Sequence, residues 1–211
     1  LLQTPQKVRI RFKGPPLKRR LFFIGVSRKM GGNRRHWYYN SGMHYTYCPE
    51  CGSKLVNHPA GDDGLVPYCE KCQRYYFDGF PTAVLTMVVN EDNEICLELQ
   101  KYLSDKYWNF VSGYVTPGET AERAAIREVQ EEVGIKLDSI RYIRSYWFEP
   151  KGILMLGFLG RAKKGPLVIS KEVNQAKWVK PEIAPSFFFP EGSGNLQWPL
   201  YEALMDEIGK K

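Results

Sequence analysis

Residues 113–135 read GYVTPGETAERAAIREVQEEVGI and hold the strongest pattern in the chain. The stretch begins with a glycine turn and a Pro-Gly turn, and Thr120 then stands where the N-cap of a helix belongs. Gly134 stands where a helix would end, because glycine readily adopts the left-handed conformation of a C-terminal cap. These signals predict a helix over Ala121–Val133, with Glu122 in its first turn.

The predicted helix has an apolar side and an acidic side. At about 100° per residue, one stripe of the helix is apolar: Ile126, Val129 and Val133. Another face collects three glutamates, because positions i, i+3 and i+4 lie together: Glu128, Glu131 and Glu132. Like charges at this spacing repel by roughly 0.2–0.5 kcal/mol per pair. The acidic face is therefore either a solvated surface or a set of oxygen ligands for a hard divalent cation.

The spacing of the whole stretch favours the cation. It fits the Nudix box G-x5-E-x7-R-E-U-x-E-E-x-G-U, where U is a bulky aliphatic residue, at nine fixed positions: Gly113, Glu119, Arg127, Glu128, Val129, Glu131, Glu132, Gly134 and Ile135. The sequence therefore resembles the Nudix hydrolases. This resemblance implies an α/β fold, the Nudix α/β/α sandwich, and hydrolysis of a diphosphate linked to a nucleoside.

The resemblance also implies a role for each charged residue of the box. Three glutamates are expected to bind Mg²⁺ or Mn²⁺, and one of them could instead act as the base: Glu128, Glu131 and Glu132. The carbonyl of Gly113 is expected to be a further ligand. Arg127 is expected to orient the glutamates through ion pairs, and Glu119 to support the loop. Such a cation neutralises the diphosphate and lowers the pKa of a bound water.

The length and the charge set further bounds. A chain of 211 residues that is 43% hydrophobic can form one ordinary domain with an appendage. No apolar run is long enough to span a bilayer and no signal peptide is visible, so we expect no membrane association and a cytoplasmic protein. Eleven of the 30 lysines and arginines fall within residues 1–42, which contain no acid; the remainder carries 19 basic residues against 23 acidic ones. The net charge of +7 is thus a property of this segment.

Residues 1–42 are expected to be a basic N-terminal extension that is not necessarily part of the fold. Residues 21–26 form a short apolar run with the character of a strand. The segment has three interpretations: an arm that binds nucleic acid, a segment that directs import into an organelle, or a solvated extension with no role.

Residues 43–80 contain two Cys-x-x-Cys pairs, separated by 17 residues: Cys48, Cys51, Cys69 and Cys72. Such paired knuckles are typical of a closed, tetrahedral, structural Zn²⁺ site, so the segment is predicted to be a zinc ribbon. Two disulfides are the alternative, although nothing else indicates secretion. Cys96 is left over in an apolar run and is expected to be buried.

Residues 81–211 are predicted to form the Nudix domain. Strands are expected at Thr82–Val89 and at residues 95–100, which should pair as a hairpin, and then at residues 140–148, 153–159, 167–169 and 176–179. A last helix is expected over Gln197–Ile208, with Pro199 near its start. Its apolar stripe is made of three residues: Leu200, Leu204 and Ile208.

A zinc ribbon directly before a Nudix domain resembles the NADH pyrophosphatases, which also remove NAD caps from RNA and are homodimers. The resemblance includes RYY at residues 74–76 and EVNQAKW at residues 172–178. It implies that Glu172 adds a metal ligand from outside the box. It also implies that Tyr114 stacks on a nucleobase, although Tyr114 is equally explained as an aromatic residue on the face of a strand.

Two features depart from that group. Its SQPWPFPxS signature, tied to nicotinamide dinucleotides, corresponds here to RSYWFEPKG at residues 144–152, which keeps Trp147 and Pro150. The basic segment also stands where the group has a large N-terminal domain. Selection of the second substrate moiety is therefore assigned to aromatic residues: Tyr114, Trp147, Phe148 and residues 187–189.

The sequence thus predicts a relaxed dinucleotide pyrophosphatase that accepts NADH or NAD⁺, free or as the cap of an RNA bound by the basic segment. A pyrophosphatase for ADP-ribose or another nucleoside diphosphate derivative is the alternative. An alternative of another class is a non-catalytic protein that binds RNA or a partner. That class is disfavoured because no glutamate of the box is lost.

Overall fold

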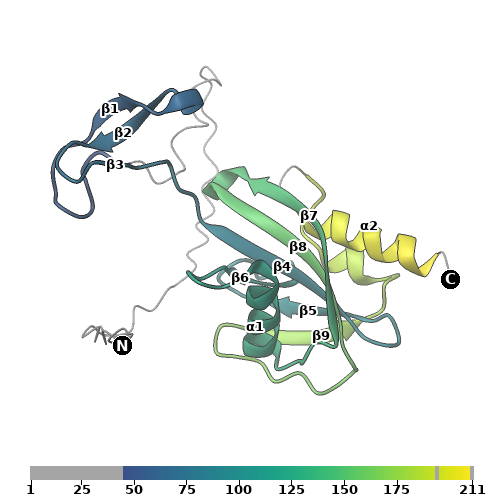
Figure 1. Ribbon diagram of the computed structural model, residues 1–211. Helices are drawn as coiled ribbons and strands as arrows, with labels where there is room; N and C mark the ends of the chain where they lie inside the picture. The colour runs from purple at the N-terminus through teal and green to yellow at the C-terminus, as the bar shows by residue number, and fades with distance from the viewer. Residues whose placement is uncertain (1–44, 193–194, 210–211) are drawn as a thin grey trace, which may run out of the picture.

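The computed structural model describes residues 45–192 and 195–209, which form two separate sheets and two α-helices (Figure 1). The basic segment of residues 1–42, including the strand expected at residues 21–26, lies outside the described residues. Within the described part of the chain, neither α-helix is long and apolar enough to cross a bilayer.

The larger sheet has six strands in the order β7-β8-β4-β5-β9, with β6 paired to β4. Its strands are β4 (Thr82–Val89), β5 (Ile95–Leu99), β6 (Val111–Tyr114), β7 (Ser139–Phe148), β8 (Ile153–Arg161) and β9 (Gln175–Val179). β4 and β8 run parallel, whereas the other paired strands are antiparallel. Seven of the eight residues of β4 are buried, as expected for a central strand covered on both faces.

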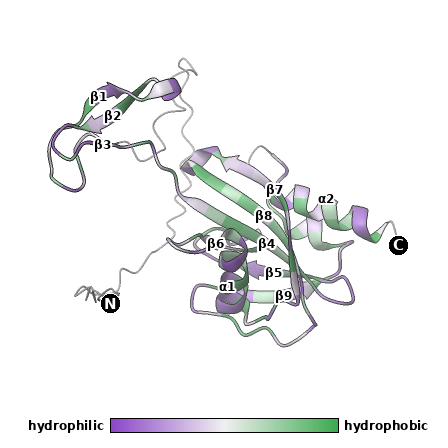
Figure 2. Cartoon of the chain, viewed as in Figure 1, coloured by the Kyte–Doolittle hydropathy of each residue, from purple (hydrophilic) through white to green (hydrophobic). Residues whose placement is uncertain are grey.

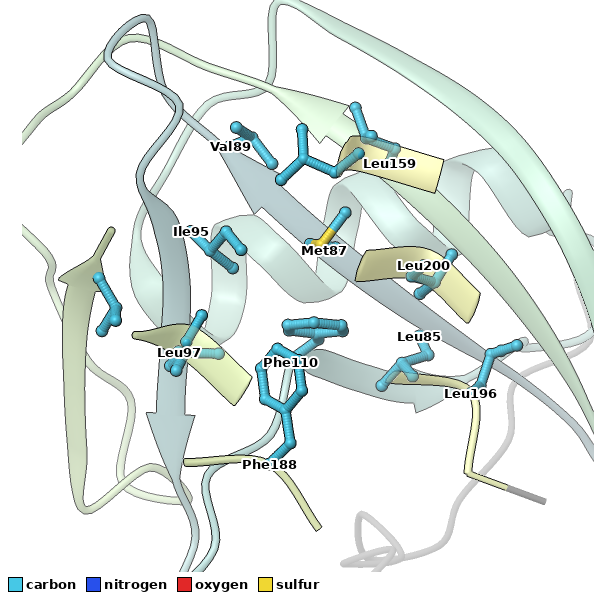
Figure 3. Packing of buried hydrophobic residues seen from close by; sticks show 13 residues of the cluster. Leu85, Met87, Val89, Ile95, Leu97, Phe110, Leu159, Phe188, Leu196 and Leu200 are labelled. Carbon is cyan, nitrogen blue, oxygen red and sulfur yellow. The ribbon is translucent and has the colours of Figure 1, made fainter. Parts of the chain in front are cut away.

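The two helices cover opposite faces of this sheet. On one face, α2 (Gln197–Ile208) contributes Leu200 and Leu204 to a core built on β4 and β5 (Figure 3). On the other face, α1 (Ala121–Val133) packs Val129 and Val133 against Val88. β4 and β8 are largely hydrophobic, whereas much of α1 is hydrophilic (Figure 2). The predicted α/β/α sandwich is therefore confirmed.

The smaller sheet consists of three antiparallel strands: β1 (Val56–Pro59), β2 (Leu65–Cys69) and β3 (Arg74–Tyr75). It stands apart from the six-stranded sheet in Figure 1. Few apolar residues are buried in this sheet and the turn before it: Cys48, Val66 and Cys69. The two sheets share no strand, but the division of the chain at residue 80 remains a prediction.

Short 3-10 helices complete the described structure: η1 (Gly61–Asp63), η2 (Glu149–Lys151) and η3 (Ala184–Phe187). η3 precedes Phe188, which enters the core beneath α2.

Three local predictions were wrong. Residues 167–169 form no strand, because their backbone closes the end of α1: the Val168 N–H donates to the carbonyl of Val133. Gly113 lies inside β6, paired with Val84, and is not in a turn. Ile126 is 43% exposed, because the smaller Ala124 and Ala125 face the sheet in its place.

Candidate active site

The helix that carries the glutamates is fixed at both ends. The hydroxyl of Thr120 accepts a hydrogen bond from the Arg123 N–H at 3.3 Å, which satisfies one free donor of the first turn. Gly134 has φ of 71°, the left-handed conformation expected at the C-terminal end. The observed helix coincides with the predicted one, so the spacing of its side chains is that inferred from the sequence.

Arg127 holds the charged residues of the box together. Its Nε and Nη2 donate to the two carboxylate oxygens of Glu119, at 2.8 and 3.0 Å. Its Nη1 donates to Glu128 Oε1 at 2.7 Å and to Glu131 Oε2 at 3.1 Å. Nη2 also donates to the carbonyl of Tyr114 at 3.0 Å. A planar guanidinium used in this way fixes the direction of each carboxylate.

Glu119 anchors this arrangement from the loop before α1. Besides Arg127, its Oε2 accepts from the backbone N–H and the hydroxyl of Thr116, at 3.1 and 2.9 Å. Arg127 first, and then these donors, lower the pKa of Glu119 to about 2 despite the opposing effect of desolvation. Glu119 is thus an anion at every pH at which the protein would work.

Gly113 is placed so that Glu128 can approach the backbone of β6. A Cβ atom at position 113 would lie 2.0 Å from both Cδ and Oε1 of Glu128. Only glycine leaves room for the carboxylate at this point. The structure therefore brings together the Gly113 backbone and a box glutamate, as the predicted metal site requires.

The three box glutamates lie in different environments. Glu131 is 59% exposed, whereas the Glu128 side chain is largely covered. Glu132 is buried, with its Oε1 accepting from Gln100 Nε2 at 3.0 Å and its Oε2 from the Ser112 N–H at 3.4 Å. Burial, followed by the charge of Glu128, raises the pKa of Glu132 to about 8.

Glu172 lies outside the box and near these acids. It is exposed on the turn before β9, and its charge contributes to the raised pKa of Glu132 and of Tyr102. This proximity agrees with the expectation that Glu172 faces the same site. Its role as a ligand remains a prediction.

A further buried carboxyl group, Glu98 on β5, was not among the predicted site residues. Burial, and then Glu132, raise its pKa well above the usual range. The signal was present in the sequence: Glu98 lies in phase with Cys96, which was expected to be buried and is fully buried. A strand pattern alone does not tell which charged group a buried glutamate will meet across the sheet.

The four cysteines of the ribbon converge. Within the described residues, they are the only group of three or more metal-binding side chains whose ligand atoms all lie within 4.8 Å of one another. The Cys51 and Cys69 sulfurs are 3.5 Å apart and those of Cys48 and Cys72 are 3.8 Å apart, too far for disulfide bonds. The cluster is compatible with a zinc ribbon. The box glutamates are less tightly gathered.

A cavity of about 290 Å³ lies beside β6, and none of the glutamates is among the residues that line it. It borders Ser112 and Gly113, and most of its wall is apolar: Leu85, Phe148, Ile153, Met155, Phe189 and Leu196. Phe148 thus lines a pocket beside the site. Trp147 packs instead against the ring of Phe80, with centroids 5.4 Å apart, and Tyr114 is not among the residues that line the cavity.

Comparison with known proteins agrees with this arrangement. The model of the NUDIX domain matches residues 79–200. The chain is 30% identical over 146 residues to "NAD-capped RNA hydrolase NudC" of Photobacterium profundum, which covers 66% of this chain and 53% of that protein. It is 27% identical over 143 residues to the protein of that name in Pseudomonas aeruginosa, covering 67% and 50%. The chain thus spans about half the length of the curated relatives it matches.

Solved structures share the fold. A NUDIX hydrolase from Nitrosomonas europaea superposes with a TM-score of 0.60 at 16% identity, covering 79% of this chain and 94% of that one. A MutT structure, from a study of Aliivibrio salmonicida and Vibrio cholerae, gives a TM-score of 0.50 at 24% identity, covering 60% and 98%.

Proposed function

The chain belongs to the NUDIX domain family, and on that premise we propose that it hydrolyses the pyrophosphate bond of a nucleoside diphosphate derivative, preferably a dinucleotide such as NADH or NAD⁺. One observation carries the preference for a dinucleotide. The cavity of about 290 Å³, walled mainly by apolar side chains, opens beside Gly113, where Glu128 meets the backbone. A flat ring can enter such a cavity while the diphosphate lies at the carboxylates.

The donors at the glutamate site fit a hard divalent cation. They are all oxygens, and one of them sits in the space that only Gly113 leaves open. We assign the ligands to four glutamates and a backbone carbonyl: Glu128, Glu131, Glu132, Glu172 and Gly113. When bound, Mg²⁺ or Mn²⁺ neutralises phosphate oxygens and lowers the pKa of the attacking water.

The protein's own residues prepare this site. Arg127 holds Glu128 and Glu131 in fixed directions and is itself held by Glu119 from the preceding loop. Gln100 fixes one oxygen of Glu132. These contacts orient the carboxylates before the substrate arrives, so little reorganisation is needed during the reaction. Any of the three box glutamates remains a candidate for the general base.

The substrate preference is tested by comparing kcat/KM for NADH, NAD⁺, FAD, ADP-ribose and a nucleoside triphosphate, each with Mg²⁺ and with Mn²⁺. We expect a dinucleotide to give the highest value. If ADP-ribose or the triphosphate exceeds every dinucleotide by more than about tenfold, or about 1.4 kcal/mol of transition-state preference, the dinucleotide assignment is wrong.

NAD-capped RNA is a second candidate substrate, since two of the relatives carry that activity in their names. We assign the RNA contact to the basic residues 1–42. A chain that begins at Met43 should then hydrolyse free NAD⁺ as the full chain does. It should also bind capped RNA more weakly and with a shallower salt dependence. Equal affinity of the two chains for capped RNA would exclude this role.

Zn²⁺ bound by Cys48, Cys51, Cys69 and Cys72 is proposed as a structural ion, because four thiolates leave no open position for chemistry. A homodimer is a further expectation from the resemblance, and a cytoplasmic location is a further expectation from the sequence. Light scattering of the purified chain at several concentrations tests the first of these.

A further inference from the structure

Glu98 is fully buried, which is unusual for a carboxyl side chain. It is 0% exposed, and its backbone is tied to Asn109 by two hydrogen bonds of 2.9 and 2.8 Å, so it cannot turn toward solvent. Ile95 and Leu97 pack into the core beneath α2. Strand alternation therefore directs Glu98 to the opposite face, which α1 covers.

Both carboxylate oxygens of Glu98 lack a hydrogen-bond partner. The described residues contain four such buried side-chain oxygens, and three of them belong to Glu98 and Gln100; the fourth is the Thr86 hydroxyl. No lysine or arginine of the described part of the chain forms an ion pair with Glu98. Buried carboxylates are normally paired, because an isolated charge in the interior is costly.

The carboxyl group nearest to Glu98 belongs to Glu132. The two groups lie within hydrogen-bonding reach if one of them carries a proton. Without a proton or a cation between them, two buried carboxylates at this separation repel each other. Either a shared proton or a bound cation would explain why two carboxyl groups are buried side by side.

The remaining unpaired oxygens, on Glu98 and Gln100, distinguish a shared proton from a cation. A shared proton would satisfy one oxygen of Glu98 and leave its second oxygen, as well as Gln100 Oε1, without a partner. A cation accepts several oxygens at once, and a set of carboxylate and amide oxygens is what Mg²⁺ and Mn²⁺ prefer. Gln100 already donates through Nε2 to Glu132, so its Oε1 is free for a cation.

We propose that Glu98 and Glu132, joined by Gln100 Oε1, bind a divalent cation between β5 and α1, on the buried side of the box glutamates. The inference rests on the proposed function, because the same class of cation serves the hydrolysis. It adds a ligand from β5, outside both the box and the turn that carries Glu172. Glu132 then faces both this buried position and the more exposed one at Glu128.

The test is a titration of the full, metal-free chain with Mn²⁺, in which electron paramagnetic resonance counts the free ion. Glu98→Gln keeps the shape of the side chain and removes its charge. We expect this variant to bind one Mn²⁺ fewer than the wild type, or to bind it at least tenfold more weakly. Glu202→Gln is the control, since it removes a carboxylate from the surface of α2, and its binding should equal that of the wild type.

Thermal unfolding provides a second measurement. Without metal, Glu98→Gln should be at least as stable as the wild type, because it no longer holds two carboxyl groups side by side in the interior. Mn²⁺ should raise its Tm less than it raises that of the wild type. If Glu98→Gln does not fold, Glu98→Asp, whose carboxylate is retracted by one methylene, should also bind Mn²⁺ at least tenfold more weakly.

Equal Mn²⁺ stoichiometry and affinity in the wild type and Glu98→Gln would overturn the inference and assign the pair to a shared proton. The proposed function would survive that result if the wild type binds Mn²⁺ and hydrolyses NADH. A wild type that neither binds Mn²⁺ nor hydrolyses any nucleotide would overturn both.

Discussion

Gly113 leaves space for the Glu128 carboxylate because it has no side chain. An added methyl group would occupy the position of the Glu128 carboxylate, at 2.0 Å from Cδ. Gly113→Ala should therefore displace Glu128 and lower kcat/KM for NADH by on the order of 100-fold, since small displacements of catalytic groups have effects of this size. Steady-state kinetics of the wild type and Gly113→Ala at saturating Mg²⁺ measure this change in kcat/KM.

Gly165→Ala is the matched control, because its added Cβ would meet only the Ile135 side chain, at 4.0 Å, which is ordinary contact. It should retain the wild-type rate. An unchanged rate in Gly113→Ala would show that the position of Glu128 does not matter for the reaction.

The sequence predicted single residues well where one local rule governs them. Thr120 and Gly134 cap the helix as expected, because capping depends on the residue and its immediate neighbours. The burial of Ile126 was predicted wrongly and the role of Glu98 was not predicted, because both depend on which residues face these side chains in the folded protein. The spacing of apolar residues does not show that Ala125 faces the sheet, or that Glu98 of a strand lies beside Glu132 of the helix.

Among the elements, the loop before α1 and the helix are joined by the ion pair of Glu119 with Arg127. The pKa of Glu119 falls from 4.5 to about 2 on folding, so the unfolded chain binds its proton more readily. The contribution of Glu119 to stability is therefore fully present above pH 4.5 and is lost as the pH falls toward 2.

Glu119→Gln should cost about 2 kcal/mol of unfolding free energy at pH 7, less than the full pKa shift implies, since Arg127 is 30% exposed. Urea unfolding of both proteins at pH 7, 4.5 and 2.5 checks this. The difference between them should shrink as the pH falls below 4.5. A difference that stays the same at pH 2.5 would contradict the assignment, and Glu122→Gln, in the exposed first turn of α1, should show little change.

Element boundaries were predicted closely where caps or alternation mark them. β4 and both α-helices begin and end where the sequence placed them. The exceptions are β6, where a glycine turn was expected, and residues 167–169, whose apolar character resembles a strand although their backbone binds the end of α1. A backbone contact between residues far apart in the chain produces no recognisable pattern in the local sequence.

For the molecule as a whole, the three-stranded sheet has too few buried apolar residues to be stable without further support. We expect elemental analysis to find about one zinc per chain. Cys69→Ser replaces a fully buried thiol of the cluster and should release the zinc and unfold this sheet, with a smaller effect on NADH hydrolysis.

Cys96→Ala is the control for zinc, since Cys96 lies in the core under α1, away from the cluster. It should keep its zinc. A protein without zinc, in which thiol counting finds two disulfides among the four ribbon cysteines, would contradict the zinc assignment.

If the glutamates of α1 support hydrolysis of a dinucleotide with a bound divalent cation, the reaction should depend on the carboxylate of Glu132, the buried member of the three. The most direct measurement is chromatography of NADH incubated with Mg²⁺ and either the wild type or Glu132→Gln. Glu132→Gln conserves the shape of the side chain and removes the charge. The wild type should release AMP and reduced nicotinamide mononucleotide, and the folded variant should do so at least about 100-fold more slowly. Near-normal release of both products by Glu132→Gln at saturating Mg²⁺ would show that this carboxylate is not needed for the hydrolysis.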